Sequence, residues 1–287
     1  MKKYFSLVLF AHSVFALPFA LIGFFLGVTT TQNPFNWYLF ALVILCMVFA
    51  RNAAMAFNRY LDRNIDAKNP RTVTRDIPAG KISASEALTF VIVNCILFVV
   101  ATYFINPLCF YLSPIALFVV LFYSYTKRFT ALCHLVLGLG LALAPIGAYI
   151  AVTGVFNIVP LFYSFAVLFW VSGFDIIYAL QDENFDREQK LHSIPAALGI
   201  KNALRLSVVL HILSALCVIL PLFFAHFSWV YYIGIAFFCA MLVYQHLLVK
   251  PNDISKVDRA FATTNGYASV IFAACFLIDT YLRAGFN

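Results

Sequence analysis

The sequence predicts an all-α, polytopic membrane protein, because its composition is too apolar for a water-soluble fold. Of its 287 residues, 63% are hydrophobic and only 11% are charged, and the mean hydropathy is +0.92. A soluble domain is about 45–50% apolar and about 25% charged. This excess of apolar surface cannot be buried inside one globule of this size. The high aromatic content and low charge also exclude a disordered chain.

Nine apolar stretches are long enough to cross a bilayer as helices, which takes about 20 residues. Each stretch is apolar on every side, and this favours helices over alternating β-barrel strands. The first run follows Lys2 and Lys3 but is too long for a signal peptide and lacks a small-residue cleavage site, so we expect a retained helix. The expected spans are 5–28, 37–57, 86–105, 108–125, 130–152, 158–180, 203–226, 229–249 and 260–282.

The charged residues predict both the orientation and the functional side. With the N-terminus in the cytoplasm, every Lys and Arg except Arg283 falls at the cytoplasmic ends of the spans, as the positive-inside rule requires. Every acidic residue except Asp279 lies on the same side, which that rule does not demand. We therefore expect the functional site on the cytoplasmic face, in the connections 58–85, 126–129, 181–202 and 250–259.

The first acidic cluster lies at the end of the second span. Asn58, Asp62 and Asp66 are spaced i, i+4 and i+8, so in a continuing helix they share one face. Arg51 lies about two turns earlier on roughly the same face. Like charges at i, i+4 repel each other. This spacing therefore costs stability unless a cation sits between the carboxylates.

The second acidic cluster repeats this pattern at the end of the sixth span. Asp175, Asp182 and Asp186 are spaced i, i+7 and i+11, again on one helical face. Asp175 lies about two turns inside the span, where an ionisable residue is costly and usually functional.

Two aspartate faces surrounded by basic residues predict a site for Mg²⁺ and a lipid diphosphate. Mg²⁺ usually takes one or two carboxylates and fills its other positions with water and phosphate oxygens, and basic side chains bind the same phosphates directly. The alternative is that these are solvated loop charges, but the duplicated spacing and the aspartate inside a span favour a site. The flanking basic residues are Arg59, Arg63, Arg71, Arg75, Lys127, Arg128 and Lys190.

Four motifs together resemble the membrane-embedded aromatic prenyltransferases, the UbiA superfamily. Residues 58–80 read N-x3-D-x3-D-x2-NPRT-x2-R-x2-PAG, similar to the first signature of the superfamily. Residues 182–186 resemble its second aspartate motif, and residues 123–127 its Tyr-x3-Lys element. The lead-in GFDxxYA at 173–179 looks like the 4-hydroxybenzoate polyprenyltransferase branch.

The resemblance implies one transmembrane domain over residues 1–287, with two four-helix bundles and a ninth helix around a central cavity. Loops near 58–85 and 181–202 would cap that cavity in the cytoplasm of a bacterium, at its inner membrane. The implied reaction is the Mg²⁺-dependent transfer of a polyprenyl group from polyprenyl diphosphate to position 3 of 4-hydroxybenzoate, or to a similar aromatic acid, in respiratory quinone biosynthesis. The expected surroundings are membrane lipid, with no nucleic acid and no obligate protein partner.

The resemblance and the chemistry together assign roles. One Mg²⁺ would be held by Asn58, Asp62 and Asp66, and a second by Asp182 and Asp186. The two tyrosines, Tyr123 and Tyr178, would shield an allylic cation through cation–π attraction. The diphosphate would be bound by Arg59, Arg63, Arg71, Arg75, Lys127 and Lys190, with Lys127 and the aspartates counted as catalytic.

Three residues keep alternative roles. Asp175 accepts or orients the proton of the acceptor hydroxyl, binds metal, or pairs with a cation. Arg51 either pairs with the acceptor carboxylate or holds Asn58 and Asp62 in place. His12 is either a packed core residue or a substrate ligand. The remaining histidines with no metal-ligand spacing, which need no function on this reading, are His134, His211, His226 and His246.

Two rival functions are considered. The context of His12 and the presence of His192 after the second motif look like polyprenyltransferases proposed to act on a naphthoate in menaquinone biosynthesis; haem, chlorophyllide and glycerol phosphate are further acceptors within the class. A secondary transporter is the rival from another class. Transporters usually have repeated halves with helices interrupted near the midplane, whereas here the charges crowd one end and the number of spans is odd.

Overall fold

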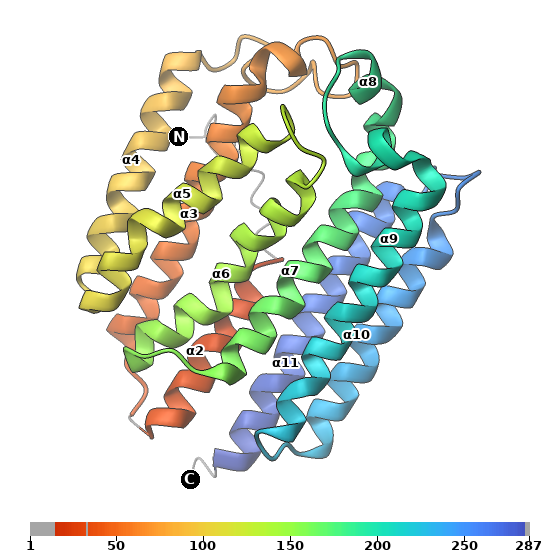
Figure 1. Cartoon of the computed structure of the whole chain (residues 1–287). Coiled ribbons are helices and arrows are strands. Elements are labelled where there is room, and N and C mark those ends of the chain that lie inside the picture. Colours follow the sequence, from red (N-terminus) through yellow and green to blue (C-terminus); the bar gives the residue numbers. More distant parts are fainter. Residues whose placement is uncertain (1–14, 33, 285–287) are drawn as a thin grey trace.

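The structure is a computed structural model that describes residues 15–32 and 34–284, and these ranges are almost entirely helical (Figure 1). Eight helices in the described ranges are long and apolar enough to cross a membrane, and α2 is a shorter apolar helix. The all-α, membrane-spanning prediction is confirmed; the expected first span begins at residues that lie outside the described ranges. The helices are α2 (Leu17–Thr31), α3 (Trp37–Asp66), α4 (Ala84–Tyr103), α5 (Pro107–Thr126), α6 (Cys133–Thr153), α7 (Ile158–Ala179), η2 (Leu180–Asp182), α8 (Glu183–Glu188), α9 (Ile194–Ile219), η3 (Leu220–Phe223), α10 (Trp229–Leu248), η4 (Arg259–Thr264, a π-helix) and α11 (Asn265–Ala284).

The bundle has two chemically different ends. The connections 67–83, 127–132, 180–193 and 249–258 lie together near the top of Figure 1, and we call this the acidic end. The connections at 104–106, 154–157 and 224–228 lie at the other end of the helices, with the end of α2 and the start of α3, and we call this the opposite end.

Short polar side chains begin the helices at the opposite end. Asn36, Asn106 and Asn157 are the N-caps of α3, α5 and α7. Their Oδ1 atoms accept hydrogen bonds from the backbone N–H groups of Leu39, Cys109 and Val159 at 3.1, 2.8 and 3.0 Å. Such caps satisfy N–H groups that have no partner within the helix, so these helices can begin abruptly at the end of the apolar stretch.

Two predicted boundaries at the acidic end are wrong. The expected connection 58–85 is helical through Asp66, because α3 continues for 30 residues. The expected connection 181–202 is helical from Ile194, where Ser193 caps α9 and its side chain accepts from Ala196 N. Gly199, at φ +74°, allows α9 to kink and continue. The two capping loops are therefore shorter than predicted.

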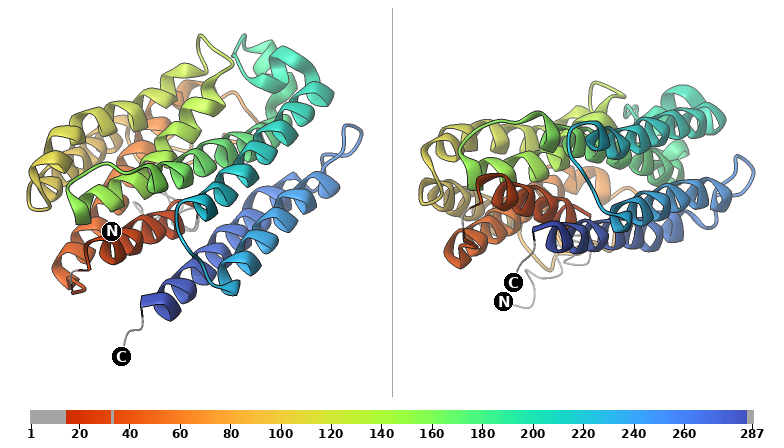
Figure 2. Two further views of the ribbon diagram at one scale, coloured as in Figure 1. Left: turned by 60° about the horizontal axis from the view of Figure 1, so that its bottom comes forward. Right: turned by 90° about the horizontal axis from the view of Figure 1, so that it is seen from below.

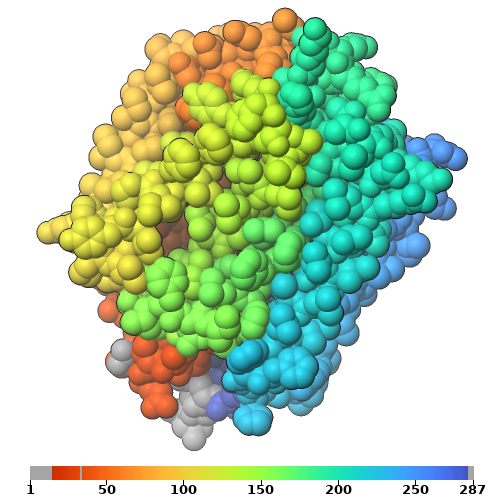
Figure 3. All heavy atoms as spheres, in the orientation of Figure 1, coloured from red at the N-terminus to blue at the C-terminus, as the bar shows by residue number. Residues whose placement is uncertain are grey.

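Aromatic packing around α7 forms the core. Trp170 is fully buried and its ring lies 5.4 Å from that of Phe19 on α2 and 5.9 Å from that of Phe238 on α10. The views in Figure 2 show α10 and α11 side by side along one flank of the bundle. Figure 3 shows that the face turned to the viewer in Figure 1 is hollowed between α5 (yellow) and α6 (green), with reddish-brown atoms of the N-terminal part of the chain at the floor.

The α6–α7 contact is the closest approach relevant to the site. A Cβ atom at Gly138 would lie 2.5 Å from the backbone oxygen of Leu168, so only glycine permits this spacing. Ser172 Oγ donates to the backbone oxygen of His134 at 3.2 Å across the same contact. The close approach brings the start of α6 against the last turns of α7, where Asp175 lies.

Candidate active site

The first aspartate face lies on the part of α3 that extends into the acidic end. Asn58 Nδ2 donates to Asp62 Oδ2 at 3.0 Å, as expected for residues one turn apart on one face. Asp62 Oδ1 accepts from Arg128 Nη2 at 2.8 Å. Arg128 Nη2 also donates to the backbone oxygen of Leu61 at 3.1 Å. The turn after α5 is thereby attached to the end of α3.

Asp66 ends α3 and is almost completely buried. Its Oδ1 accepts from Arg75 Nη1 at 2.7 Å, and its backbone oxygen accepts from Thr72 Oγ1 at 3.2 Å. Its second carboxylate oxygen, Oδ2, is buried and has no hydrogen-bond partner among the described residues. A charged oxygen in that position is costly unless something compensates it.

Asp182 joins the two motifs although they lie more than a hundred residues apart in sequence. Its carboxylate accepts from Arg71 through Nε at 3.0 Å and through Nη2, a bidentate pair. Asn69 Nδ2 donates to the same carboxylate at 3.0 Å, and Arg71 Nη1 donates to Tyr178 OH at 2.9 Å. Burial by itself lowers the pKa of Arg71, but its hydrogen bonds to Asp182 outweigh this and raise the pKa, so the guanidinium stays charged.

Asp186 is fully buried on α8 and pairs with Lys127, whose Nζ lies 2.7 Å from Oδ1. Burial by itself lowers the pKa of Lys127, but the nearby Asp186 charge outweighs this and raises the pKa. Lys127 and Arg128 are consecutive residues. One short turn after α5 therefore contacts Asp186 on α8 and Asp62 on α3, and brings the two aspartate motifs into one site.

Arg59 carries a buried donor that no described residue uses. Its Nη1 atom is buried and has no hydrogen-bond partner among the described residues. Its charge acts on both Asp66, at the end of α3, and Tyr123, in the last turn of α5. A buried, unpaired N–H group of a cation is suited to an anionic ligand.

Asp175 has a partner that sequence reasoning missed. Its Oδ2 lies 2.6 Å from Nδ1 of His134, at the start of α6. The spacing of His134 gave no metal motif, and it was expected to need no function. A signal was present, because an aspartate inside a span needs a polar partner at the same depth, and His134 begins the preceding span.

Residues 16–274 match the UbiA prenyltransferase family. The chain belongs to this family. It is 33% identical over 250 residues to a 4-hydroxybenzoate octaprenyltransferase of Aliivibrio fischeri (strain MJ11), which is 83% of each chain. A second 4-hydroxybenzoate octaprenyltransferase, from Tolumonas auensis, is 29% identical over 244 residues, or 82% of each. The predicted resemblance is therefore confirmed, and the chain is an integral membrane enzyme that transfers prenyl groups.

Solved UbiA structures share this fold. The apo structure of a UbiA homolog from Aeropyrum pernix K1 aligns with a TM-score of 0.83 at 29% identity, covering 93% of this chain and 98% of that one. A UbiA homolog from Archaeoglobus fulgidus bound to DMAPP and Mg²⁺ aligns with a TM-score of 0.77 at 20% identity, covering 98% and 99%. At that lower identity the likeness concerns the fold alone.

The donor set of this UbiA-family chain fits a hard divalent cation. In the described ranges no three His, Cys, Asp or Glu side chains form a ready metal cluster. Mg²⁺ does not need one, since it combines one or two carboxylates with water and phosphate oxygens. Oδ2 of Asp66 and Oδ2 of Asp186 are both buried without a hydrogen-bond partner, and such oxygens are the ligand type that Mg²⁺ prefers.

Several expected residues of the UbiA site lie apart from these contacts. Arg63 folds onto its own helix, where Nη1 donates to the backbone oxygen of Tyr60 at 2.7 Å and the guanidinium lies 4.7 Å from the Tyr60 ring centre. Lys190 is exposed on the surface after α8. Arg51 lies on α3 within electrostatic range of Tyr123. His12, expected either as a packed core residue or as a substrate ligand, lies outside the described residues.

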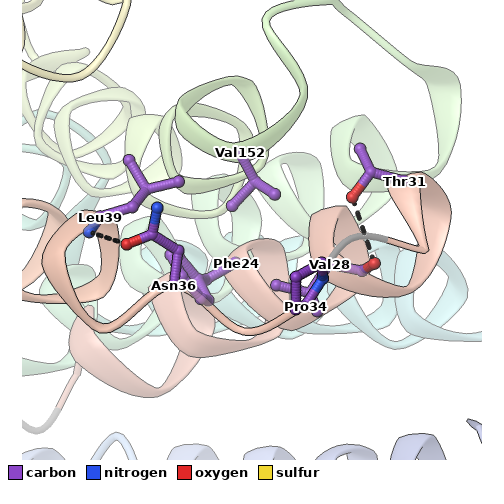
Figure 4. Close-up of a pocket in the computed structure, with 7 residues that line it drawn as sticks. All are labelled: Phe24, Val28, Thr31, Pro34, Asn36, Leu39 and Val152. Atoms are coloured by element: carbon purple, nitrogen blue, oxygen red, sulfur yellow. Dashed lines mark hydrogen bonds between the residues drawn. The ribbon is translucent and has the colours of Figure 1, made fainter.

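A cavity of about 350 Å³ lies at the opposite end of the molecule, away from the aspartates. It is formed between α2, α6 and the start of α3 (Figure 4). The side chains that line it are Phe24, Val28, Thr31, Pro34, Asn36, Leu39 and Val152. This lining carries no ionisable group, so the cavity offers no means of activating a diphosphate.

Proposed function

We propose that this chain transfers a polyprenyl group from polyprenyl diphosphate to position 3 of 4-hydroxybenzoate or a similar aromatic acid, in respiratory quinone biosynthesis. The observation that carries the proposal is the pairing of Arg71 with Asp182, because it joins the loop after the first aspartate motif to the second motif. The names of the relatives, 4-hydroxybenzoate octaprenyltransferases, support the choice of acceptor. Residues 1–287 form one transmembrane domain in this proposal.

Mg²⁺ is the proposed cofactor. Asn58, Asp62 and Asp66 hold one ion, and Asp182 and Asp186 hold a second. When bound, the ions supply positive charge that stabilises the diphosphate as the allylic C–O bond breaks. The Mg²⁺ and DMAPP named for the Archaeoglobus fulgidus homolog are consistent with this choice.

Basic side chains of this chain bind the phosphate oxygens. Arg59 contributes the buried Nη1 group that has no protein partner. Arg71, Arg75 and Lys127 each carry one ion pair to an aspartate and have further N–H groups for phosphate. Ligation by Arg63 and Lys190 stays a prediction, because their contacts in the structure do not point to it.

Aromatic side chains next to the site keep water from the reacting allylic carbon. Tyr178 stacks on Phe261 with ring centres 4.1 Å apart, and Phe261 packs 5.5 Å from Phe174. A water-poor, aromatic wall protects a carbocation from hydrolysis and stabilises it through cation–π attraction. Tyr123, at the end of α5, completes the wall in this proposal. The ring carbon next to the acceptor hydroxyl then attacks the cation, and this carbon loses its hydrogen as a proton to the released diphosphate, which restores the aromatic ring.

The acidic end faces the cytoplasm in this proposal, in the inner membrane of a bacterium. Within the described ranges, the Lys and Arg residues other than Arg283 lie toward that end of the helices, which the positive-inside rule favours. The substrates would enter from the lipid and from the cytoplasm, without a protein partner.

The test is a transfer assay with the purified chain in lipid nanodiscs. Labelled polyprenyl diphosphate and Mg²⁺ are supplied with 4-hydroxybenzoate or with a hydroxynaphthoate, one at a time. We expect label in a prenylated 4-hydroxybenzoate, loss of product with EDTA, and recovery with added Mg²⁺. If only the naphthoate is prenylated, the acceptor is a naphthoate and not 4-hydroxybenzoate. If no aromatic acid is prenylated, the proposal is contradicted.

A further inference from the structure

Both ring nitrogens of His134 have a defined partner, and one of these partners is Asp175. Ile194, the first residue of α9, donates its backbone N–H to His134 Nε2 at 3.3 Å. The other ring nitrogen, Nδ1, donates to Asp175 Oδ2 at 2.6 Å. The two contacts fix the His134 ring between the start of α9 and Asp175. His134 thus holds one oxygen of Asp175 in a fixed direction.

The other oxygen of Asp175 is accessible. The Asp175 side chain is 22% exposed, whereas that of His134 is only 4% exposed. Oδ1 of Asp175 has no hydrogen bond from any residue in the described ranges. Asp175 lies on the same face of α7 as Tyr178, one turn away, and η2 continues the helical path to Asp182. Since Tyr178 and Asp182 both contact Arg71, this face of α7 is turned toward the site.

Tyr123 connects Asp175 to the rest of the site. The Tyr123 side chain is within electrostatic range of Asp62, Arg59 and Asp175, and Arg51 acts on the same tyrosine. Seven residues of helix separate Asp175 from Asp182, which is about 10 Å along the axis. Asp175 therefore lies deeper in the bundle than Asp182.

We propose that Asp175 Oδ1 accepts a hydrogen bond from the hydroxyl group of the aromatic acceptor, and that His134 is a positioning residue for Asp175. The acceptor class is then an aromatic acid with a free hydroxyl donor, whose ring is held beside Tyr123. The hydrogen bond places the carbon next to the hydroxyl toward the allylic centre. This inference rests on the proposed function, and it adds the means by which the site recognises the hydroxyl. In this role the hydroxyl keeps its proton.

Substitution of His134 tests the positioning role. Loss of an oriented hydrogen bond of about 1.4 kcal/mol corresponds to a tenfold change in binding, so in His134→Ala we expect the KM for the acceptor to rise about tenfold. The KM for polyprenyl diphosphate should stay unchanged. His134→Asn, whose amide N–H can replace the Nδ1 donor, should recover most of the loss. His226, an exposed histidine at the opposite end, gives the control variant His226→Ala. Unchanged acceptor KM in His134→Ala would overturn the inference.

A second experiment avoids dependence on how well His134→Ala folds. In Asp175→Asn, the side-chain oxygen should accept from Nδ1–H of His134, and the NH₂ group should face the aromatic substrate. The group that faces the substrate hydroxyl then donates a hydrogen bond instead of accepting one. We measure inhibition by 4-methoxybenzoate, which cannot donate a hydrogen bond. Wild type should bind it at least tenfold more weakly than 4-hydroxybenzoate, and Asp175→Asn should lose or reverse this preference. A preference that persists in Asp175→Asn rejects the inference.

The failures of the two proposals are distinguishable. If wild type transfers prenyl groups to no hydroxylated aromatic acid, the proposed function fails. If wild type is active and both Asp175→Asn and His134→Ala retain its acceptor KM and its preference for the hydroxyl, only the inference fails.

Discussion

The two ends of the bundle satisfy their polar groups in different ways. At the opposite end most of the charged and capping contacts are close in sequence: each N-cap asparagine accepts from a backbone N–H two or three residues further on, and Asp279 pairs with Arg283 one turn away. Asp279 also accepts from the distant Ser228 N. At the acidic end three carboxylates pair with residues 59 to 111 positions away, and Arg59 and Asp66 keep buried atoms without partners.

This difference suggests that the polar groups of the opposite end contribute to stability and those of the acidic end to activity. A polar group with a local partner costs little to order, since the chain between the partners is short. A polar group with a distant partner, or with none, lowers stability unless it has another use. We therefore expect substitutions at the acidic end to reduce activity more than stability, and substitutions at the opposite end to do the reverse.

The largest effect is expected for Asp182→Asn. The variant removes one charge of the second motif but keeps the size of the side chain, so the transfer rate should fall about 10³-fold, while the thermal unfolding temperature changes little. The control is Asp253→Asn at the same end of the molecule, because Asp253 is exposed and bonded only within its own loop. A rate within tenfold of wild type in Asp182→Asn would remove the basis for placing metal there.

A smaller effect on the rate is expected for Arg59→Met. Methionine removes the buried guanidinium, so the KM for polyprenyl diphosphate should rise about 10-fold to 100-fold, as expected for a charged hydrogen bond of about 1.5–3 kcal/mol. The free energy of unfolding should stay the same or increase, because a buried donor without a partner has been removed. Arg205→Met, at an exposed position on α9, is the control. A loss of stability without a change in KM would make Arg59 a structural residue.

At the opposite end, Asp279→Ala should affect stability alone. Asp279 is fully buried, accepts from Ser228 N at 2.5 Å and pairs with Arg283 at 2.7 Å. Its removal leaves both donors without this acceptor and should lower the free energy of unfolding by about 1–3 kcal/mol. Thermal unfolding in detergent measures this, and the rate per folded molecule should match wild type. Asp279→Asn should retain part of the stability; a lost transfer rate in folded Asp279→Ala would end the proposed separation of the two ends.

The smallest effect is expected for Asn157→Ala. This variant removes the N-cap of α7, whose Oδ1 accepts from Val159 N at 3.0 Å. Loss of such a cap costs about 1 kcal/mol, so the unfolding temperature should fall by a few degrees without a change in rate. Asn157→Ser, which can still cap the helix, should restore most of the loss. If Asn157→Ala reduces the rate as strongly as it reduces stability, the start of α7 and the site are coupled.

The fold was predictable from sequence because a bilayer requires long apolar segments with internally satisfied backbones. The eight spanning helices agree with the predicted stretches to within a few residues at most ends. The exceptions lie at the acidic end, where α3 and α9 continue beyond the apolar core. The length of the apolar stretch does not show where a helix ends once it has left the apolar core. The start of α9 is indicated instead by local residues: the Ser193 cap, Pro195 in the first turn and Gly199 at the kink.

The site was predictable only where helical periodicity or family resemblance applied. The shared face of Asn58, Asp62 and Asp66 follows from their spacing. The pairing of Arg71 with Asp182 depends on tertiary packing, which periodicity does not report. His134 was missed for the same reason: its role depends on which residues the close α6–α7 contact at Gly138 and the N-terminus of α9 bring against it, and the sequence around His134 does not report those tertiary neighbours.

The continuity of α3 limits how this site can vary. Because α3 runs without a break from the apolar interior to Asp66, the positions of Asn58, Asp62 and Asp66 relative to one another are fixed at about 6 Å per step by the helix rise. The facing wall is made of shorter pieces, η2, α8 and the loop 67–83. We therefore expect relatives with ligands of another size to differ in η2, α8 and the loop 67–83. The spacing of Asn58, Asp62 and Asp66 along α3 should stay the same.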